Sequence, residues 1–298
     1  MSMLELSVVI FPSSPSIDKL FITTFPVPCG VMFISAFEPL LAISFVVIAP
    51  VVIPPDNVTA PVNVPVVAVN AATSNAPAVT VMPPDLSAPV AVVVPNLKCC
   101  GRPKLSNGMM DEAKSDIDMN ISSIHPYIAN GAKLVGIEPS CILGFLGDFP
   151  DLASNKNKAY EISENTMLIE EFLLHHFDTK NEVEFSNPPK NKKALFHGHC
   201  HQKALVGTSP AMQLLNRIPG LETTEINSGC CGMAGSFGFD KSHYDISMDI
   251  GEMTLFPRIR EESDDVIIIS EGVSCRQQIQ EGTKRNSKHI VQILADYI

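Results

Sequence analysis

Two pairs of adjacent cysteines, each followed by glycine, are the residues of this chain best suited to chemistry. One pair is Cys230-Cys231-Gly232 and the other is Cys99-Cys100-Gly101. Adjacent thiolates can bridge or flank metal atoms, and small neighbours let the backbone approach and point its N–H groups at sulfur. The two pairs therefore indicate a metal or iron–sulfur site.

Each pair is followed at a similar distance by one more cysteine. Cys141 lies 41 positions after Cys100, and Cys275 lies 44 positions after Cys231. Such self-similarity at a fixed spacing indicates an internal repeat. The chain is therefore expected to contain two related cysteine-rich halves.

The second half offers four thiols, from Cys200, Cys230, Cys231 and Cys275. Four thiolates suit an iron–sulfur cluster or a tetrahedral zinc ion. Zinc is the less favoured alternative, because zinc sites usually draw on paired Cys-x-x-Cys segments and this sequence contains none. Buried cysteines acting as small apolar side chains are disfavoured too, because glycine, serine or histidine flanks most of them.

The first half offers only three thiols, from Cys99, Cys100 and Cys141. The position equivalent to the opening cysteine of the second half is Val69, and the nearest upstream cysteine, Cys29, is far out of register. This half is expected to hold a cluster with a non-cysteine ligand, a partial site, or no metal.

Three histidines, His197, His199 and His201, alternate around Cys200. They can ligate metal, donate hydrogen bonds to cluster sulfur, or shuttle protons. If this segment were a strand end, the period of two would put all three on one face, opposite Cys200.

Two basic residues, Lys203 and Arg276, each follow a cysteine segment and can offset the negative charge of thiolates. The simpler alternative is that both are ordinary charged side chains exposed to solvent.

The formal net charge of −11 argues against a nucleic-acid-binding surface. A disulfide framework is disfavoured, because vicinal cysteines bridge each other only with strain and no cleavable secretory signal is evident. The expected location is the cytoplasm, at the inner face of the membrane if partners hold the chain there.

The elements that must position these residues alternate between strands and helices. Strands are expected at residues 133–137, 194–196, 221–226 and 265–270. Helices are expected at residues 108–129, 158–177, 209–217, 244–255, 276–280 and 289–298. This alternation predicts an α/β fold with mainly parallel sheets. Loops beyond the carboxyl ends of such strands gather functional groups. The four thiols of the second half are therefore expected to converge.

Residues 1–92 differ from the rest, with fourteen of the 24 prolines and only six charged residues. Proline this frequent interrupts helices and central strands, so an irregular Pro/Val-rich segment is expected. Residues 31–53 are apolar enough to suggest a membrane span, but Glu38, Pro39 and Pro50 interrupt them and no basic flank follows. A frameshifted or misassigned start is a further interpretation of residues 1–92.

The rest of the chain divides into two modules. Residues 93–187 form the first, incomplete module, and residues 188–298 form the second, complete module.

Five segments resemble the CCG-type cysteine-rich domain of iron–sulfur oxidoreductases. The family includes the cysteine-rich subunit of heterodisulfide reductase, the iron–sulfur subunit of glycolate oxidase and lactate-utilisation proteins. The resemblance is greatest to the C-terminal part of FAD-linked D-2-hydroxyacid dehydrogenases of the D-lactate or 2-hydroxyglutarate type. The segments are residues 97–103, 138–141, 197–203, 229–238 and 271–276.

The resemblance implies duplicated α/β modules and a [4Fe–4S]-type cluster on Cys200, Cys230, Cys231 and Cys275, with a second cluster possible in the first module. It implies a flavin-containing dehydrogenase partner, which holds the FAD, and a downstream electron acceptor. This sequence shows no FAD-binding domain and no Cys-x-x-Cys-x-x-Cys-x-x-x-Cys-Pro run, which in relatives lie upstream or on a partner.

The hypothesis is therefore an iron–sulfur electron-transfer part of a flavin-linked 2-hydroxyacid oxidoreductase, which does not oxidise substrate alone. The alternatives are a zinc-binding structural module without redox activity and a subunit like heterodisulfide or thiol reductases. Residues 1–92 stand where a charged strand–loop–helix unit should open the first module, which favours a misassigned start.

Overall fold

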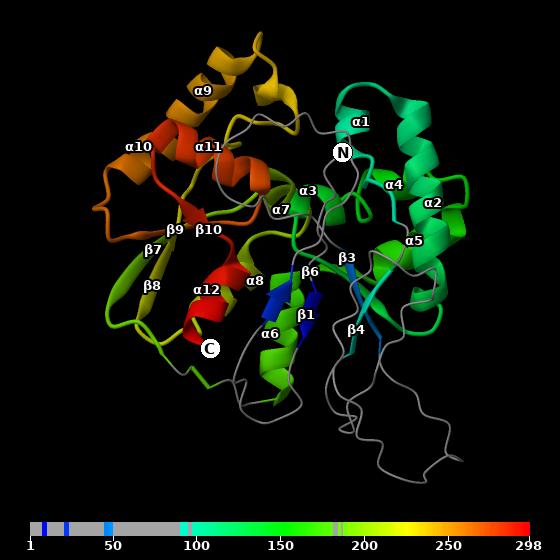
Figure 1. Cartoon of the computed structure of the whole chain (residues 1–298), viewed down its shortest axis with the longest axis horizontal. Coiled ribbons are helices and arrows are strands. Elements are labelled where there is room, and N and C mark those ends of the chain that lie inside the picture. Colours follow the sequence, from blue (N-terminus) through cyan, green and yellow to red (C-terminus); the bar gives the residue numbers. More distant parts are fainter. Residues whose placement is uncertain are drawn as a thin grey trace.

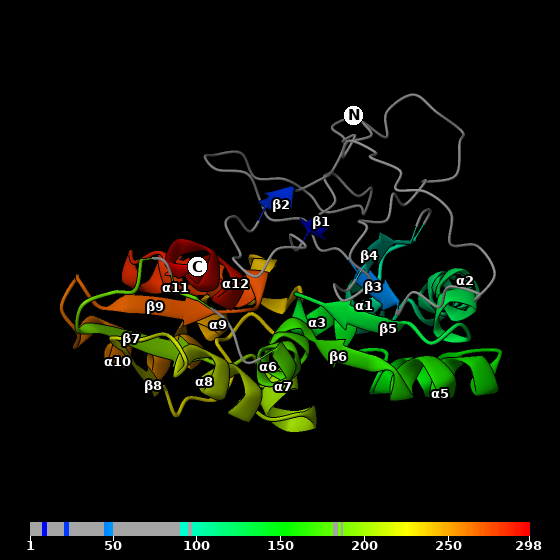
Figure 2. The ribbon, with the colours of Figure 1, turned by 90° about the horizontal axis from the view of Figure 1, so that it is seen from below.

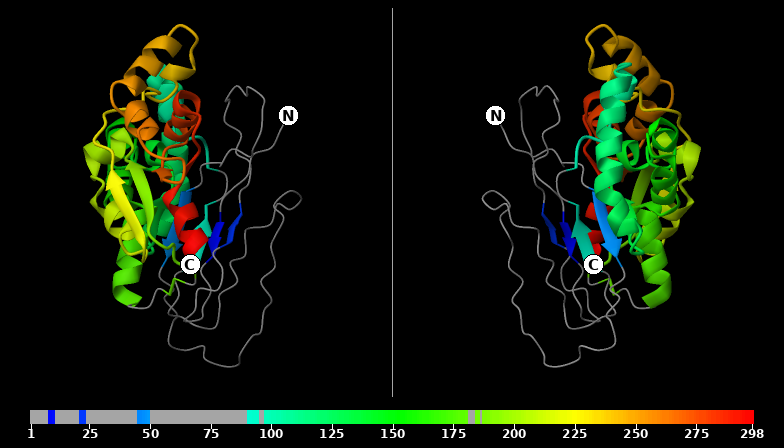
Figure 3. Two further views of the ribbon diagram at one scale, coloured as in Figure 1. Left: turned by 90° about the vertical axis from the view of Figure 1, so that its left-hand side faces the viewer. Right: turned by 90° about the vertical axis from the view of Figure 1, so that its right-hand side faces the viewer.

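The computed structural model describes residues 94, 97–178, 184–185 and 187–298 in full. It describes the backbone alone of residues 8–10, 21–23, 45–49, 90–93 and 179–180. Two four-stranded sheets lie side by side with helices packed around them (Figures 1 and 2). The long helix α2 is in front in the right-hand view of Figure 3 and the second sheet in the left-hand view, so the two halves lie at opposite ends.

The second sheet has the order β10-β9-β7-β8, and all its strands are parallel. Its strands are β7 (Lys192–His197), β8 (Leu221–Glu225), β9 (Ile267–Ser270) and β10 (Ser287–Lys288). Its helical segments are α7 (Cys200–Leu205), α8 (Ser209–Leu215), η1 (Phe237–Phe239), α9 (Tyr244–Glu252), α10 (Leu255–Arg260), α11 (Val273–Thr283) and α12 (Ile290–Tyr297).

Helices cover both faces of this second sheet. Phe196 of β7 packs into a core with α8 and α12, whereas its neighbour Leu195 packs into another core with α10 and α11. Successive side chains of a strand point to opposite faces, so an uninterrupted apolar run such as Ile267–Ile269 is what a doubly covered strand requires.

The first sheet has the order β4-β3-β5-β6 and is mixed. Strand β5 is parallel to β6, but β3 is antiparallel to both β4 and β5. The strands are β3 (Phe45–Ala49), β4 (Val90–Val93), β5 (Lys133–Gly136) and β6 (Thr166–Leu168), and a separate antiparallel pair is β1 (Val8–Ile10) with β2 (Phe21–Thr23). The helices are α1 (Arg102–Ser106), α2 (Met110–Ile128), α3 (Pro139–Ile142), α4 (Asp148–Leu152), α5 (Lys156–Glu164) and α6 (Ile169–Lys180).

The two sheets are related as the cysteine repeat predicts. Strand β4 leads to Cys99 as β8 leads to Cys230, and β5 leads to Cys141 as β9 leads to Cys275. The duplicated α/β architecture expected from the sequence is therefore confirmed. The exception is the strand equivalent to β7: β3 holds that place in the order but runs in the opposite direction.

The first core shows why α2 forms where the sequence predicts it. Ile117, Ile121, Ile124 and Ile128 recur at helical spacing and are buried against β5 and α5. An apolar stripe at intervals of three and four residues faces one side of a helix. This helix lies along the outer side of the first module (Figures 1 and 3).

Helix α6 joins the two halves. It follows β6 of the first sheet, but Leu173 and Phe177 are buried in the core formed by α8 and α12. Val135 of β5 contributes to the same core. The division of the chain at residue 188 stays a prediction.

Several expected elements are wrong in detail. The continuous helix expected at residues 158–177 is interrupted by strand β6. Ile162 packs in the first core and Leu173 in the second, and one straight helix cannot reach both cores. The helix expected to end before Pro257 ends at Glu252, and the proline lies in the first turn of α10, where its missing N–H is harmless.

Two helices that carry cysteines differ from the prediction. The sequence did not predict helix α7, and α11 begins at Val273, before the expected start at residue 276, so it includes Cys275. Within the described residues, no helix is long and apolar enough to span a membrane. The possible membrane span at residues 31–53 lies outside the described residues, apart from strand β3. The rest of residues 1–92 also lies outside them, apart from the other short strands given above.

Buried polar contacts fasten the first module to the second. The carboxylate of Glu138 accepts a hydrogen bond from the backbone N–H of Val273 at 2.8 Å, at the start of α11, and another from the hydroxyl of Ser140 at 2.6 Å. Nε2 of His289, at the start of α12, lies 2.9 Å from the carbonyl oxygen of Ile137. Each module thus supplies a hydrogen-bond partner for the other.

We expect Glu138→Ala to lower the free energy of unfolding by about 3 kcal/mol, because it removes a charge-assisted hydrogen bond and leaves a buried N–H without a partner. Glu138→Gln keeps an acceptor and should cost less than half as much. Urea unfolding of both variants measures the difference. Equal stability of Glu138→Ala and the natural chain would contradict this account of the contact.

Candidate metal centre

The carboxyl ends of three neighbouring strands bring the cysteines of the second module together. Strand β7 lies between β8 and β9: the chain passes from β7 to β8 on one side and then returns across β7 to β9 on the other. Crevices at such a switch in strand order are the usual ligand sites of parallel sheets. Cys200 begins α7 after β7, Cys230 and Cys231 lie in the loop after β8, and Cys275 lies in the first turn of α11 after β9.

The four thiols lie beside one another and shift one another's pKa. The neighbouring Cys230 raises the pKa of Cys200, and Cys200 lowers that of Cys230. Cys230 and Cys275 raise the pKa of Cys231, and Cys231 lowers that of Cys275. The structure therefore brings together the four thiols that the sequence assigned to one site.

Backbone N–H groups stabilise the negative form of Cys230. The N–H of Gly232 lies 3.3 Å from its sulfur, and the N–H of Ala234 also bonds to it. Hydrogen bonds to the charged form of a group lower its pKa. The glycine-rich loop thus provides the N–H donors that the sequence pattern indicated.

Gly232 has a conformation that requires glycine. Its φ is +107°, and a side chain there would overlap the carbonyl oxygen of Ser247 on α9. The hydroxyl of Ser247 donates to the carbonyl of Gly232 at 2.9 Å, and the amide of Gln278 on α11 donates to the carbonyl of Ser247 at 3.0 Å. These two buried residues were missed in the sequence, because an uncharged polar side chain inside a helix gives no pattern of its own.

His197 lies beside the thiols. It ends β7, it is fully buried, and a ring nitrogen of His197 lies within 4.8 Å of the sulfurs of Cys231 and Cys275. Cys231 lowers the pKa of Cys275 most, and the nearby imidazole of His197 lowers it further.

His199 and His201 have different roles from His197. Nδ1 of His199 accepts the N–H of His201 at 3.2 Å and caps α7, while Gln202 accepts the N–H of His199. The condition under which all three histidines would share one strand face is not met, because β7 ends at His197 and helix α7 begins at Cys200. Burial lowers the pKa of His201, and the nearby His199 and Arg102 lower it further.

The two basic residues are anchored to backbone carbonyls. Nζ of Lys203 lies 2.6 Å from the carbonyl oxygen of Ser228 and 3.0 Å from that of Gly229, so it holds the loop that precedes Cys230. The guanidinium of Arg276 donates to the carbonyls of Ser270 and Glu271, at the end of β9. Both residues therefore position cysteine segments, in addition to placing positive charge near them.

The three thiols of the first module also lie together. The sulfurs of Cys100 and Cys141 are 3.1 Å apart, and hydrogen bonds to Cys141 and Cys99 raise the pKa of Cys100. Asn120 of α2 holds this loop: its amide accepts from the N–H of Lys98 at 2.7 Å and donates to the carbonyl of Cys99 at 3.1 Å. Strand β3 is antiparallel to β5, and the sequence contains no cysteine between Cys29 and Cys99, so the segment that follows β3 offers no fourth thiol.

The two cysteine loops face each other between the modules. The amide of Asn107, just after the first loop, donates to the hydroxyl of Ser236, just after the second, at 3.0 Å. Helices α3 and α7 are neighbours at the centre of Figure 1. Contacts between the two modules therefore lie close to both cysteine loops.

A pair of buried carboxyl groups lies behind α7. Nε2 of Gln202 donates to Glu170 of α6 at 2.6 Å, and Glu271 lies beside Glu170. Burial raises the pKa of Glu170 to about 7, and burial together with the charge of Glu170 raises the pKa of Glu271. Both oxygens of Glu271 and Oε2 of Glu170 lack a hydrogen-bond partner among the described residues, which is consistent with the raised pKa of both carboxyl groups.

The donor set fits a metal centre. Four thiols and one imidazole gather at one sheet edge, and seven cysteines of the described part form no disulfide there. Thiolates bind iron–sulfur clusters and zinc, and imidazole binds zinc and iron.

Residues 194–280 match the family described as CCG, cysteine-rich domain, and this part of the chain is a domain of that type. The chain is 30% identical over 199 residues to one subunit of the anaerobic glycerol-3-phosphate dehydrogenase of Escherichia coli K12, covering 66% of this chain and 49% of that protein. It thus spans about half the length of that relative.

Two further relatives show lower identity. Lactate utilization protein A 1 of Bacillus mycoides is 26% identical over 211 residues, which cover 66% of this chain and 80% of the relative. D-2-hydroxyglutarate dehydrogenase of Pantoea ananatis is 25% identical over 169 residues, which cover 56% of this chain and 16% of the relative. No solved structure matches the chain.

The two CCG glycines form a matched pair for mutation. At Gly101, φ is +89° but an added Cβ meets only ordinary contacts of 3.4 Å, so Gly101→Ala should cost about 1–2 kcal/mol of stability. Gly232→Ala should cost at least twice as much, because the backbone of α9 must also move. Thermal unfolding and metal content of both variants measure this, and an equal loss in the two would show that the contact with Ser247 is unimportant.

The raised pKa of Glu170 predicts a pH dependence. The unfolded carboxyl titrates near pH 4.5 and the folded one near 7, so folding favours the protonated form and stability falls as the pH rises from about 4.5 to 7. Glu170→Gln should remove most of this fall, on the order of 3 kcal/mol, relative to the natural chain. Unfolding at pH 5 and pH 8 tests it, with Glu222→Gln on the surface as the control; parallel curves for all three chains would refute it.

Proposed function

We propose that this chain is the iron–sulfur electron-transfer part of a flavin-linked oxidoreductase that acts on a hydroxyl substrate. The observation that supports it most is the gathering of four thiols and a buried imidazole in a CCG-type domain. Similarity to dehydrogenases and a dehydrogenase subunit agrees with this role.

The chemistry divides between the chain and its partner. Oxidation of a CH–OH group to a carbonyl releases two electrons and two protons, which a flavin on the partner takes up together. When bound, an iron–sulfur cluster accepts and passes on single electrons. Cys200, Cys230, Cys231 and Cys275 would hold it as a [4Fe–4S] cluster, and Cys99, Cys100 and Cys141 would hold a second one. A cytoplasmic chain, held at the inner face of the membrane by its partners, suits delivery to a further acceptor.

Two substrate classes follow from the relatives. A 2-hydroxyacid, such as D-lactate, glycolate or D-2-hydroxyglutarate, is our first proposal. Glycerol 3-phosphate is the second, because the relative with 30% identity is a glycerol-3-phosphate dehydrogenase subunit. In either case the substrate binds to the flavin partner, so the isolated chain should not reduce a dye with any of these compounds.

The first test is anaerobic production of the chain followed by iron and zinc analysis and EPR spectroscopy. We expect brown protein with several irons per chain and a signal that appears on reduction by photoreduced flavin. Cys231→Ser should lose the iron that the second module binds, whereas Cys100→Ser should lose only what the first module binds.

Other results would overturn the proposal. Colourless protein with zinc in place of iron would indicate a structural module. Iron-containing protein that reduces a disulfide substrate by itself would indicate a thiol reductase. Iron-containing protein that flavin cannot reduce would exclude electron transfer from a flavin partner.

A further inference from the structure

His197 has one ring nitrogen with a partner and one without. Nδ1 lies 2.9 Å from the hydroxyl oxygen of Ser228, in the loop that leads to Cys230. Nε2 is buried and has no hydrogen-bond partner among the described residues. A polar atom left in this state costs free energy unless something else satisfies it.

Two buried sulfurs lie beside the imidazole ring. A ring nitrogen of His197 and the sulfurs of Cys231 and Cys275 all lie within 4.8 Å of one another. A neutral imidazole has one N–H and one lone pair. If Nδ1–H donates to Ser228, the lone pair of Nε2 is directed away from Ser228 and is available to a metal.

The bond to Ser228 is the usual companion of a metal-binding histidine. A ligating imidazole normally uses its other nitrogen for a hydrogen bond that fixes the ring and the tautomer. The neighbouring His199 differs, because its Nδ1 accepts the N–H of His201, so Nε2 of the neutral ring carries the proton and offers no lone pair to a metal. His197 is therefore the histidine of this segment that is prepared for coordination.

We propose that Nε2 of His197 is a direct ligand of the metal centre, beside Cys231 and Cys275, so that the centre has mixed thiolate and imidazole coordination. This inference rests on the proposed function. A neutral imidazole brings no negative charge, unlike a thiolate, so it favours the reduced form of a centre and raises its reduction potential. The ligand choice would thus make the centre a readier acceptor of electrons from a flavin.

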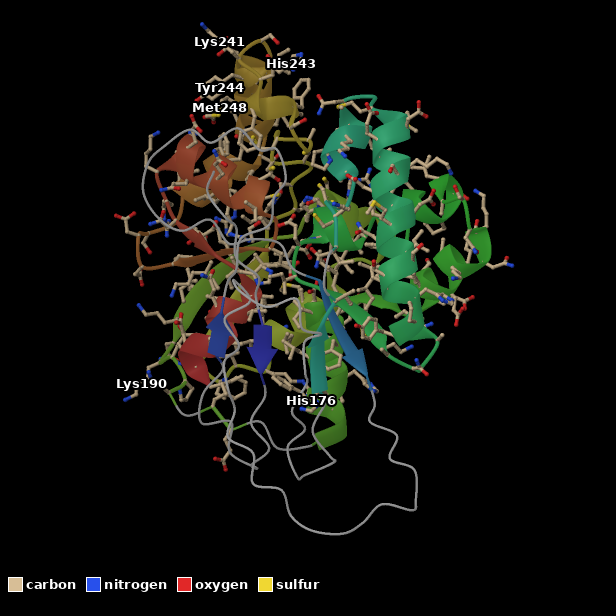
Figure 4. All side chains as sticks on the ribbon, turned by 45° about the vertical axis from the view of Figure 1, so that its right-hand side comes forward. His176, Lys190, Lys241, His243, Tyr244 and Met248 are labelled. Atoms are coloured by element: carbon tan, nitrogen blue, oxygen red, sulfur yellow. The ribbon has the colours of Figure 1, made fainter. Side chains whose placement is uncertain are left out.

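The test uses the full chain, produced anaerobically with ring-15N histidine, and three variants. His197→Cys replaces the nitrogen by a thiolate, His197→Gln removes the ligand, and His176→Gln changes a histidine of α6 at the far lower end of the molecule (Figure 4). Pulsed EPR of the reduced protein detects nitrogen bonded to iron, and X-ray absorption at the edge of the bound metal detects a nitrogen neighbour.

We expect the natural chain and His176→Gln to show a strongly coupled nitrogen, and both His197 variants to lack it. His197→Cys should keep its iron and titrate at a lower potential, and His197→Gln should lose at least half of its metal. Iron-loaded natural chain without a bonded nitrogen, or with one that persists in His197→Cys, overturns this inference and leaves the proposed function intact.

The remaining outcomes separate the two claims. A zinc-loaded chain with a nitrogen neighbour that disappears in His197→Cys overturns the electron-transfer proposal but supports His197 as a ligand. A chain that binds no metal after reconstitution overturns both.

Discussion

The direction of the strands is the constraint on which the rest of the structure depends. Because β7, β8 and β9 are parallel, their carboxyl ends lie at one sheet edge and bring Cys200, Cys231 and Cys275 into contact. The same end of the first sheet receives two cysteine segments, after β4 and after β5, and the sequence contains no cysteine between Cys29 and Cys99 that could add a third segment. The number of thiols at each site thus follows from how many of these strands are followed by a cysteine.

Buried polar side chains then fix each cysteine segment in place. Ser247 and Gln278 hold Gly232, Lys203 holds the loop before Cys230, and Asn120 holds Cys99. Each of these contacts satisfies a backbone carbonyl or N–H that the irregular loops leave without a secondary-structure partner. The thiols are therefore held together by hydrogen bonds of their loops, and a metal would enter a site that is largely formed.

The repeat of Cys-Cys-Gly segments and the alternation of apolar runs were enough to predict the α/β class, the duplication and the convergence of four thiols. They did not predict β6, because the residues around Ile162 and Leu173 read as one amphipathic helix until their separate cores are known. Nor did they reveal Glu170, a glutamate in a helix rich in charged residues, whose burial depends entirely on how α6 packs against α7 and β9. Tertiary packing, which local patterns do not carry, decides both.

Helix α6 occupies in the first repeat the place that α12 occupies in the second, yet both are buried in the same core. A fragment cut at residue 188 would therefore separate Leu173 and Phe177 from the residues of α8 and α12 against which they are buried, and each fragment would expose apolar surface that the whole chain covers.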